Sequence, residues 1–597
     1  MQVVTRSYNA ARSGANLSET ILTPRKVGAN LLVKKLSLHF TNDPHVKDDP
    51  RLEAQPLYVS NLQMSDGKAH DVVYVCTMAN NVWAFDANDG KPIWNHPTNL
   101  GTPISPKPTP HPGFPKSTEI DLWGVNERWG VLSTPVLDTA NDKMYVVCWT
   151  SQDGSVAKAV YELHEVDMKT GKDLRKTQIE TTADPSQHVA GKPVATFIPS
   201  KQKQRASLLL TKAGSPAALV LFIGFGMTHE EHDPSHGWIL AYDVASMKQT
   251  AAWCTTPAGS GCGVWQGGQG PAADDNGDVY LMTGNYGVLD HNNDTVPPAA
   301  GDLPQSLIKL HYTAPVGGVP GRLEAVAWFT PFIDHDRNSN GDDDFQDYDL
   351  GSAGPLVLTG LNLVVGAGKD GVVYVLPQDT NEFGKGSDFH RLKKPPIFFT
   401  YFPGFGIDAS VVGNLDHLFD GKTHHQHCSP AFWNGSNGPM LFNWGENECL
   451  RAWKVDASGT IAFVAKSAEV ASAGVAGRGG MPGGILAVSS NGKNHNSGIV
   501  WATVPISGDA NKFVVEGILR AYDASRLNAT PNADGTARLK LLWDSKHIPG
   551  NHFNFSKFCP PVVADGKVLV PTYDGRVDIY GLVAPPQEGP LPTNANM

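Results

Sequence analysis

An acidic segment between residues 336 and 347 has the spacing of side chains that wrap a calcium ion. Its oxygen-bearing residues alternate at Asp336, Asn338, Asn340 and Asp342, with a glycine sixth in the segment and Asp347 twelfth. Calcium prefers six to eight oxygen ligands, and a glycine at the sixth position allows the sharp turn. Aspartate at the twelfth position is shorter than the usual glutamate, so we predict a structural calcium ion of modest affinity. The alternative is a solvated acidic loop without metal.

Histidines gather in two segments that interrupt the regular strand pattern. The first holds His229, His232 and His236, and the second ends in His427, directly before a predicted inner strand. Imidazoles at such spacing bind transition metals such as Cu, Zn or Fe. The four side chains predict a transition-metal site if the two segments face each other across one opening. The alternative is loop histidines that bind nothing.

One four-strand unit recurs along the chain and must position these segments. Its clearest copy has strands at 53–60, 72–77 and 81–86, followed by a turn with Asp and Gly and a fourth segment that ends in Trp94. Alternating apolar residues between turn residues are typical of antiparallel strands. The tryptophan is expected to dock across the join to a neighbouring unit.

Proline-containing pairs mark the predicted start of each innermost strand. They lie at Gln55-Pro56, Thr134-Pro135, Ser215-Pro216, Gly270-Pro271, Gly354-Pro355, Ser429-Pro430, Pro482-Gly483 and Pro560-Pro561. A closed ring of sheets absorbs 597 residues without a linker. We therefore predict an all-β fold, a single eight-bladed β-propeller of four-stranded antiparallel blades over residues 1–583, with a Pro-rich C-terminal tail at 584–597.

Three stretches are longer than the turns of a blade, at 103–129, 179–208 and 379–415. We expect them to project as loops over one mouth of the axial channel. The alternative architecture is a β-sandwich or two unrelated β domains, but sandwiches do not repeat one four-strand unit.

The signature Ala-Phe-Asp-Ala-x-x-Gly-x-x-x-Trp at 84–94 resembles the repeats of pyrroloquinoline-quinone propellers, the quinoprotein alcohol dehydrogenase-like superfamily, of which the chain looks like a degenerate member. In that family a strand ending Thr-Gly-Asn supplies a calcium ligand, and a Gly-Asp pair before Ser-Leu-x-x-Leu supplies the catalytic base. Here Thr-Gly-Asn ends at Asn285, and Gly-Asp ends at Asp302. The resemblance implies that Asn285 binds calcium and that Asp302 is the base.

Lys369, which precedes Asp-Gly, matches the family's basic residue that contacts the quinone, and Glu231 lies near the place of its calcium-binding glutamate. The resemblance implies that the bound quinone accepts a hydride from an alcohol while calcium polarises it. Two family features are missing: no two cysteines are adjacent, and Trp265 lies too early by spacing to form the floor under the ring.

These patterns leave three functions open. The first is a quinoprotein-like oxidoreductase that oxidises an alcohol or sugar-type substrate at the axial funnel. The second is a quinone-free, metal-dependent lyase or hydrolase that uses the His-rich loops. The third is a non-catalytic binding scaffold. A bound quinone would separate the first from the others, and a stoichiometric transition metal would separate the second from the third.

Composition limits the partners. The net charge of −11 disfavours nucleic acid, and the apolar runs are too short for a membrane span. We predict a small-molecule substrate and, for a dehydrogenase, a protein electron acceptor. Cys254 and Cys262 enclose a Gly-rich loop and are either bridged or reduced. No leader-like segment precedes the repeats, so the protein is either cytosolic or exported with its leader removed; we adopt a periplasmic or secreted location as the prediction.

Overall fold

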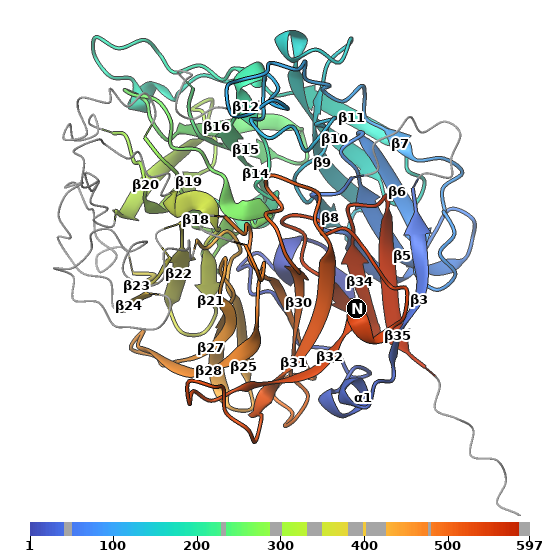
Figure 1. Ribbon diagram of the computed structural model, residues 1–597. Coiled ribbons are helices and arrows are strands. Elements are labelled where there is room, and N and C mark those ends of the chain that lie inside the picture. The colour runs from blue at the N-terminus through green and yellow to red at the C-terminus, as the bar shows by residue number, and fades with distance from the viewer. Residues whose placement is uncertain are drawn as a thin grey trace, which may run out of the picture.

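The computed structural model describes residues 1–40, 51–228, 235–286, 301–330, 349–369, 371–379, 398–401, 425–475 and 479–583. Eight sheets stand around a common centre, which is the predicted eight-bladed propeller (Figure 1). Neighbouring strands are antiparallel, apart from the short β2 (Ala15–Asn16), which pairs in parallel with β29 (Ile485–Ser489). The one α-helix of the described residues, α1, spans Pro24–Gly28, and none of their helices is long and apolar enough to span a bilayer.

The blades follow one another along the chain. Blade 1 contains β1 (Gln2–Val3), β4 (Leu57–Gln63), β5 (Ala69–Cys76), β6 (Asn81–Asp86) and β7 (Thr98–Asn99), and blade 2 contains β8 (Val136–Asp138), β9 (Lys143–Thr150), β10 (Val160–Asp167) and β11 (Asp173–Gln178). Blade 3 contains β12 (Gln202–Lys203), β13 (Leu209–Ala213), β14 (Ala218–Met227), β15 (Trp238–Asp243) and β16 (Lys248–Cys254), and blade 4 contains β17 (Ala272–Ala273), β18 (Val279–Met282), β19 (Leu307–Thr313) and β20 (Arg322–Phe329).

The second half repeats the plan. Blade 5 contains β21 (Leu356–Leu358), β22 (Leu363–Ala367), β23 (Val372–Pro377) and β24 (Phe398–Tyr401), and blade 6 contains β25 (Ala431–Gly435), β26 (Gly438–Asn443), β27 (Cys449–Val455) and β28 (Ile461–Val470). Blade 7 contains β2, β29, β30 (Ile499–Pro505), β31 (Gly517–Leu527) and β32 (Leu539–Asp544), and blade 8 contains β33 (Val562–Ala564), β34 (Lys567–Pro571), β35 (Arg576–Leu582) and β3 (Leu32–His39).

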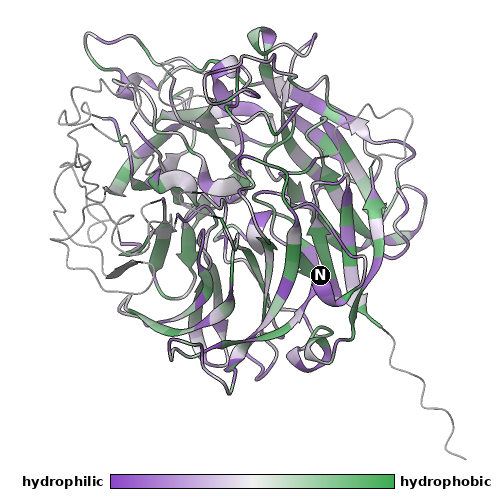
Figure 2. Cartoon of the chain, in the orientation of Figure 1, coloured by the Kyte–Doolittle hydropathy of each residue, from purple (hydrophilic) through white to green (hydrophobic). Residues whose placement is uncertain are grey.

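Apolar side chains fill the join between each pair of neighbouring blades, and Figure 2 colours many residues of the strands as hydrophobic. Eight buried clusters correspond to the eight joins. One of them combines Phe85 of blade 1 with Ile579 of blade 8, so the ring is closed. Each sheet is therefore covered on both faces, and non-directional apolar burial fixes the blade order.

Trp94 docks across a join as predicted. Its ring lies over Gly171, in the turn between β10 and β11 of blade 2, where an added Cβ would lie 2.6 Å from the indole. Gly171 has a φ of +74°, so both the backbone and the ring exclude a side chain there. The fourth strand of blade 1 is β7, which begins four residues after Trp94.

Ser215-Pro216 corrects one of the proposed strand starts. The pair lies in the turn between β13 and β14, after the strand that it was expected to open. Strands directly follow the prolines at β4, β8, β17, β21, β25 and β33, whereas β29 begins two residues after Pro482-Gly483.

The N-terminal segment closes the ring and fills its centre. In Figure 1 the blue β3 lies beside the red β35, with which it pairs antiparallel. Residues 4–14, which we call the hub, reach every blade. Their contacts run to Gln55, Leu137, Leu208, Ala273, Val357, Phe432, Val488 and Val563, one residue for each of the eight blades.

Candidate functional site

A cavity of about 280 Å³ lies at the propeller axis, because segments from all round the ring line it. Its lining comprises Ile120, Asp121, Leu122, Trp123, Trp129, Lys203, Arg205, Thr228, Trp265, Gly267, Asp349, Ser352, Lys369, His427, Met481, Asn511, Lys557 and Phe558. Most of these residues stand just before an inner strand or just after the strand that follows it. The antiparallel blades bring those positions to the same mouth. The stretch at 103–129, predicted to lie over one mouth, supplies part of the wall.

Indole rings give the cavity flat apolar walls. The Lys203 ammonium lies 4.5 Å from the centroid of Trp129 and 6.0 Å from that of Trp265. Trp265 rests on two glycines, since a Cβ at Gly226 or Gly263 would lie 2.7 or 2.6 Å from its ring. These glycines let Trp265 lie close against the backbone, and a flat ligand would find a stacking surface beside a cation.

Among the described residues, four cations line the cavity, against two carboxylates. Burial, reinforced by the neighbouring Arg205, lowers the pKa of Lys203 to about 8. Burial also lowers the pKa of Lys557. Arg205 lies 3.3 Å from Glu53, which is buried behind the wall. Positive groups crowded in this way favour a polyanionic ligand, whose carboxylates would relieve their mutual repulsion.

Lys369 and Asn285 are joined through Asp349, which the sequence reasoning did not single out. The Lys369 ammonium donates to Asp349 Oδ2 at 2.7 Å, and the backbone N–H of Asn285 donates to Asp349 Oδ1 at 2.9 Å. Gln305 Nε2 donates to Asn285 Oδ1 at 2.6 Å. Lys369 therefore reaches the cavity wall in a fixed position, while Asn285 is buried one layer behind it.

Asp302 is buried close to this network. Its carboxylate accepts hydrogen bonds from the backbone N–H of Ala258 at 2.9 Å and from the Tyr286 hydroxyl at 2.8 Å. Burial raises the pKa of Asp302, although these hydrogen bonds oppose the shift. Both donors are uncharged, so the negative charge stays available for a proton. Asp302 is not among the residues that line the cavity in the described part of the chain.

Several predicted ligands lie outside the described residues: Glu231, His229 and His232, and the calcium loop with Asp336, Asn338, Asn340, Asp342 and Asp347. His236 is described, and its Nδ1 lies 3.0 Å from the Thr256 carbonyl oxygen. Burial lowers the pKa of His236.

His427 stands on the cavity wall with two further ligand-type side chains. Its Nε2 lies 2.8 Å from Glu446 Oε1, and His425 Nδ1 lies 3.8 Å from the other Glu446 oxygen. One ligand atom from each of the three can come within 4.8 Å of the others. Burial lowers the pKa of His427 despite Glu446, which favours the neutral imidazole that metals bind. The described residues thus pair His427 with His425 and Glu446, and His236 is not part of the group.

None of the cysteines is among the residues that line the cavity in the described part of the chain. Cys254 and Cys262 are both buried, and no disulfide joins them.

Sequence reasoning missed Lys203 and Arg205 and set Trp265 aside. Trp265, which by its spacing lies too early for the floor under the ring, lines the cavity just before the 3-10 turn at Gln266–Gly268. The sequence Gln-Lys-Gln-Arg at 202–205 was a signal for these cations, since it places two of them shortly before an apolar strand.

No family model matches the chain, and no curated protein sequence matches it. Among solved structures, it is similar to a quinohemoprotein alcohol dehydrogenase from Pseudomonas putida HK5, with a TM-score of 0.50 and 14% identity over 98% of this chain and 81% of that one. A quinohemoprotein alcohol dehydrogenase from Comamonas testosteroni gives a TM-score of 0.50 and 15% identity over 98% of this chain and 82% of that one. A europium-containing methanol dehydrogenase gives a TM-score of 0.50 and 12% identity over 97% of this chain and 98% of that one. At such identities the likeness establishes the propeller fold.

Proposed function

We propose that the chain is a quinoprotein-like oxidoreductase that oxidises an alcohol or sugar-type substrate in the axial cavity. The observation that carries the proposal is the pairing of flat indole walls with four cations at the axis. Pyrroloquinoline quinone is a flat ortho-quinone with three carboxylates, so its shape and charge suit this lining. The likeness in fold to quinohemoprotein alcohol dehydrogenases supports the same reading.

The lining residues suggest which part of the quinone each of them would hold. Trp129 and Trp265 would stack on the ring, and Lys203, Arg205 and Lys557 would hold its carboxylates. When bound, the quinone supplies a two-electron acceptor for the substrate's hydride. Asp349 keeps Lys369 in place, and Asn285 with Glu231 would supply oxygen atoms for calcium.

Asp302 is not on the described cavity wall, so as the base it would take the hydroxyl proton of a substrate that extends beyond that wall to its carboxylate. Its carboxylate is held by uncharged donors, whereas the charge of Asp349 is already compensated by Lys369 at 2.7 Å. A base with a raised pKa accepts a proton more readily than an ion-paired carboxylate.

Titration of the full chain with pyrroloquinoline quinone and calcium is expected to load about one quinone per cavity and to quench indole fluorescence, because two tryptophans line the site. Lys203→Met should weaken uptake by about 30-fold or more, as expected for losing a buried charged contact. Lys212→Met, an exposed lysine on β13, is the matched control. No uptake by the wild-type chain would refute the proposal.

Quinone affinity is expected to fall as the pH rises through about 8, because Lys203 loses its positive charge there. Below that pH the ammonium is fully charged, and affinity stays constant. The dissociation constant measured by fluorescence one unit below and one unit above this point checks the result. In Lys203→Met the pH dependence should disappear, and its persistence would assign it to another group.

The cluster of His425, His427 and Glu446 favours a second candidate, a metal-dependent lyase or hydrolase acting at the same mouth. Two imidazoles and a carboxylate with an open fourth position are a ligand set that activates water on zinc. A transition metal that is retained by the wild-type chain and lost in His427→Gln, without quinone uptake, would favour this candidate.

A further inference from the structure

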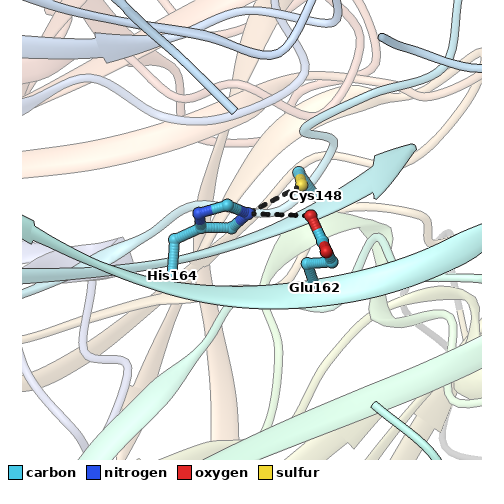
Figure 3. Close-up of side chains that lie close together, drawn as sticks. All are labelled: Cys148, Glu162 and His164. Atoms are coloured by element: carbon cyan, nitrogen blue, oxygen red, sulfur yellow. Dashed lines mark hydrogen bonds and ion pairs between the residues drawn. The ribbon is translucent and has the colours of Figure 1, made fainter. Parts of the chain in front are cut away.

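Cys148, Glu162 and His164 converge on one face of blade 2 (Figure 3), and none of them lines the axial cavity. Glu162 stands directly opposite Cys148 in the register of β9 and β10, and His164 follows two residues later on the same strand. Cross-strand partners and residues two apart share a face of a sheet. This face packs against blade 1, where the Cys148 thiol donates to the Leu100 carbonyl oxygen at 3.5 Å.

Two of the three distances between the ligand atoms already match those around a tetrahedral ion. His164 Nε2 lies 3.4 Å from Cys148 Sγ and 3.5 Å from Glu162 Oε2, and all three atoms lie within 4.8 Å of one another. Zinc bonds of about 2.0–2.3 Å place neighbouring tetrahedral ligands roughly 3.3–3.7 Å apart. An ion could therefore be bound with little movement of the strands.

A further carboxylate orients the imidazole. Asp173 Oδ2 lies 2.9 Å from His164 Nδ1, which leaves Nε2 to face the thiol and Glu162. A carboxylate on the far nitrogen is the usual support of a metal-binding histidine. Figure 3 shows Nε2 directed at the sulfur and oxygen atoms.

A divalent ion would neutralise the net negative charge of the side chains around the three ligand atoms. Cys148 as thiolate, Glu162 and Asp173 carry three negative charges, and Lys176, 2.9 Å from Glu162 Oε1, carries one positive charge. A divalent cation brings the sum to zero.

We propose that Cys148, Glu162 and His164 form a zinc-class metal site, with Asp173 as the positioning residue and water in the fourth position. Binding releases the thiol proton of Cys148 and the Nε2 proton of His164 to solvent. The ion ties β9 to β10 beside the join with blade 1, so its role is structural. The site is independent of the quinone cavity and of whether that cavity binds quinone.

Cobalt(II) added to the metal-stripped full chain tests the site, because a cobalt–thiolate bond gives a charge-transfer band in the near ultraviolet. We expect the band to saturate near one cobalt per chain and zinc to abolish it. The His425, His427 and Glu446 cluster contains no sulfur, so metal bound there gives no such band. Absence of the band in the wild-type chain at saturating cobalt would overturn the proposal, and this decision needs no variant.

Variants then locate the ligand. Cys148→Ser should lose the band, while Cys76→Ser, which alters a buried thiol in the same apolar cluster, should keep it. Asp173→Asn should keep the band but weaken cobalt binding by about 10–100-fold, as expected for removal of a positioning carboxylate. Loss of the band in Cys76→Ser with retention in Cys148→Ser would contradict the assignment.

Discussion

Asp302→Asn is expected to lower turnover of the quinone-loaded protein by about 10²–10⁴-fold, the usual contribution of a general base. The amide keeps the size of the carboxylate but cannot accept the hydroxyl proton. Quinone uptake should remain unchanged, since Asp302 is not on the described cavity wall. Reduction of an artificial electron acceptor with a panel of alcohols and sugars measures turnover, and fluorescence quenching measures uptake.

Asp349→Asn is the paired comparison. It removes the partner that holds Lys369 at 2.7 Å, so its main effect should be weaker quinone binding. Because burial raises the pKa of Asp302, kcat/KM should rise with pH through that pKa in the wild type, and the rise should vanish in Asp302→Asn. Full turnover by Asp302→Asn, with loss of turnover at normal uptake in Asp349→Asn, would move the base to Asp349.

Arg12→Ala is expected to destabilise the propeller by about 3–5 kcal/mol, because it strips buried carbonyl groups of their donor. The Arg12 side chain is fully buried in the hub. It donates to the carbonyl oxygens of Leu208 and Pro271, both at 2.9 Å, and so joins blades 3 and 4 to the N-terminal segment. Urea denaturation followed by circular dichroism measures the loss.

The geometry of the guanidinium sets the controls. Arg12→Lys keeps the charge but offers one nitrogen for acceptors on two sides, so most of the stability should still be lost. Arg25→Ala, on the exposed face of α1, should change the free energy of unfolding by less than about 0.5 kcal/mol. Equal stability of Arg12→Ala and Arg25→Ala would show that the hub is not held by Arg12.

The fold was readable from sequence because each blade repeats a local pattern. In strand β6, for example, the side chains of Asn-Val-Trp-Ala-Phe-Asp lie alternately on the two faces of the sheet, and the turn residues follow at once. The pairing of β3 with β35 was not readable, since it joins segments more than 500 residues apart with no matching motif. Ser215-Pro216 misplaced the inner strand of blade 3, because a proline suits a hairpin turn as well as a strand start.

Part of the candidate site could also be predicted from the sequence. Lys369 was identified from the family resemblance and His427 from its place directly before an inner strand, and both line the cavity. Lys203 lies on the two-residue strand β12, inside the stretch at 179–208 that the sequence pattern predicts as a loop. Its burial against Trp129 depends on two insertions meeting in space, which no local spacing encodes.

The hub has a consequence for how the protein is made. The Tyr8 hydroxyl accepts from the backbone N–H of Val563, 555 residues later, so the ribosome delivers the first partner long before the last. At cellular translation rates this interval is roughly half a minute to two minutes. During that time the nascent chain holds apolar blade faces that have no neighbour, and the ring closes in one late event. Biosynthesis of this protein should therefore depend on chaperones that shield an open arc of blades until blade 8 emerges.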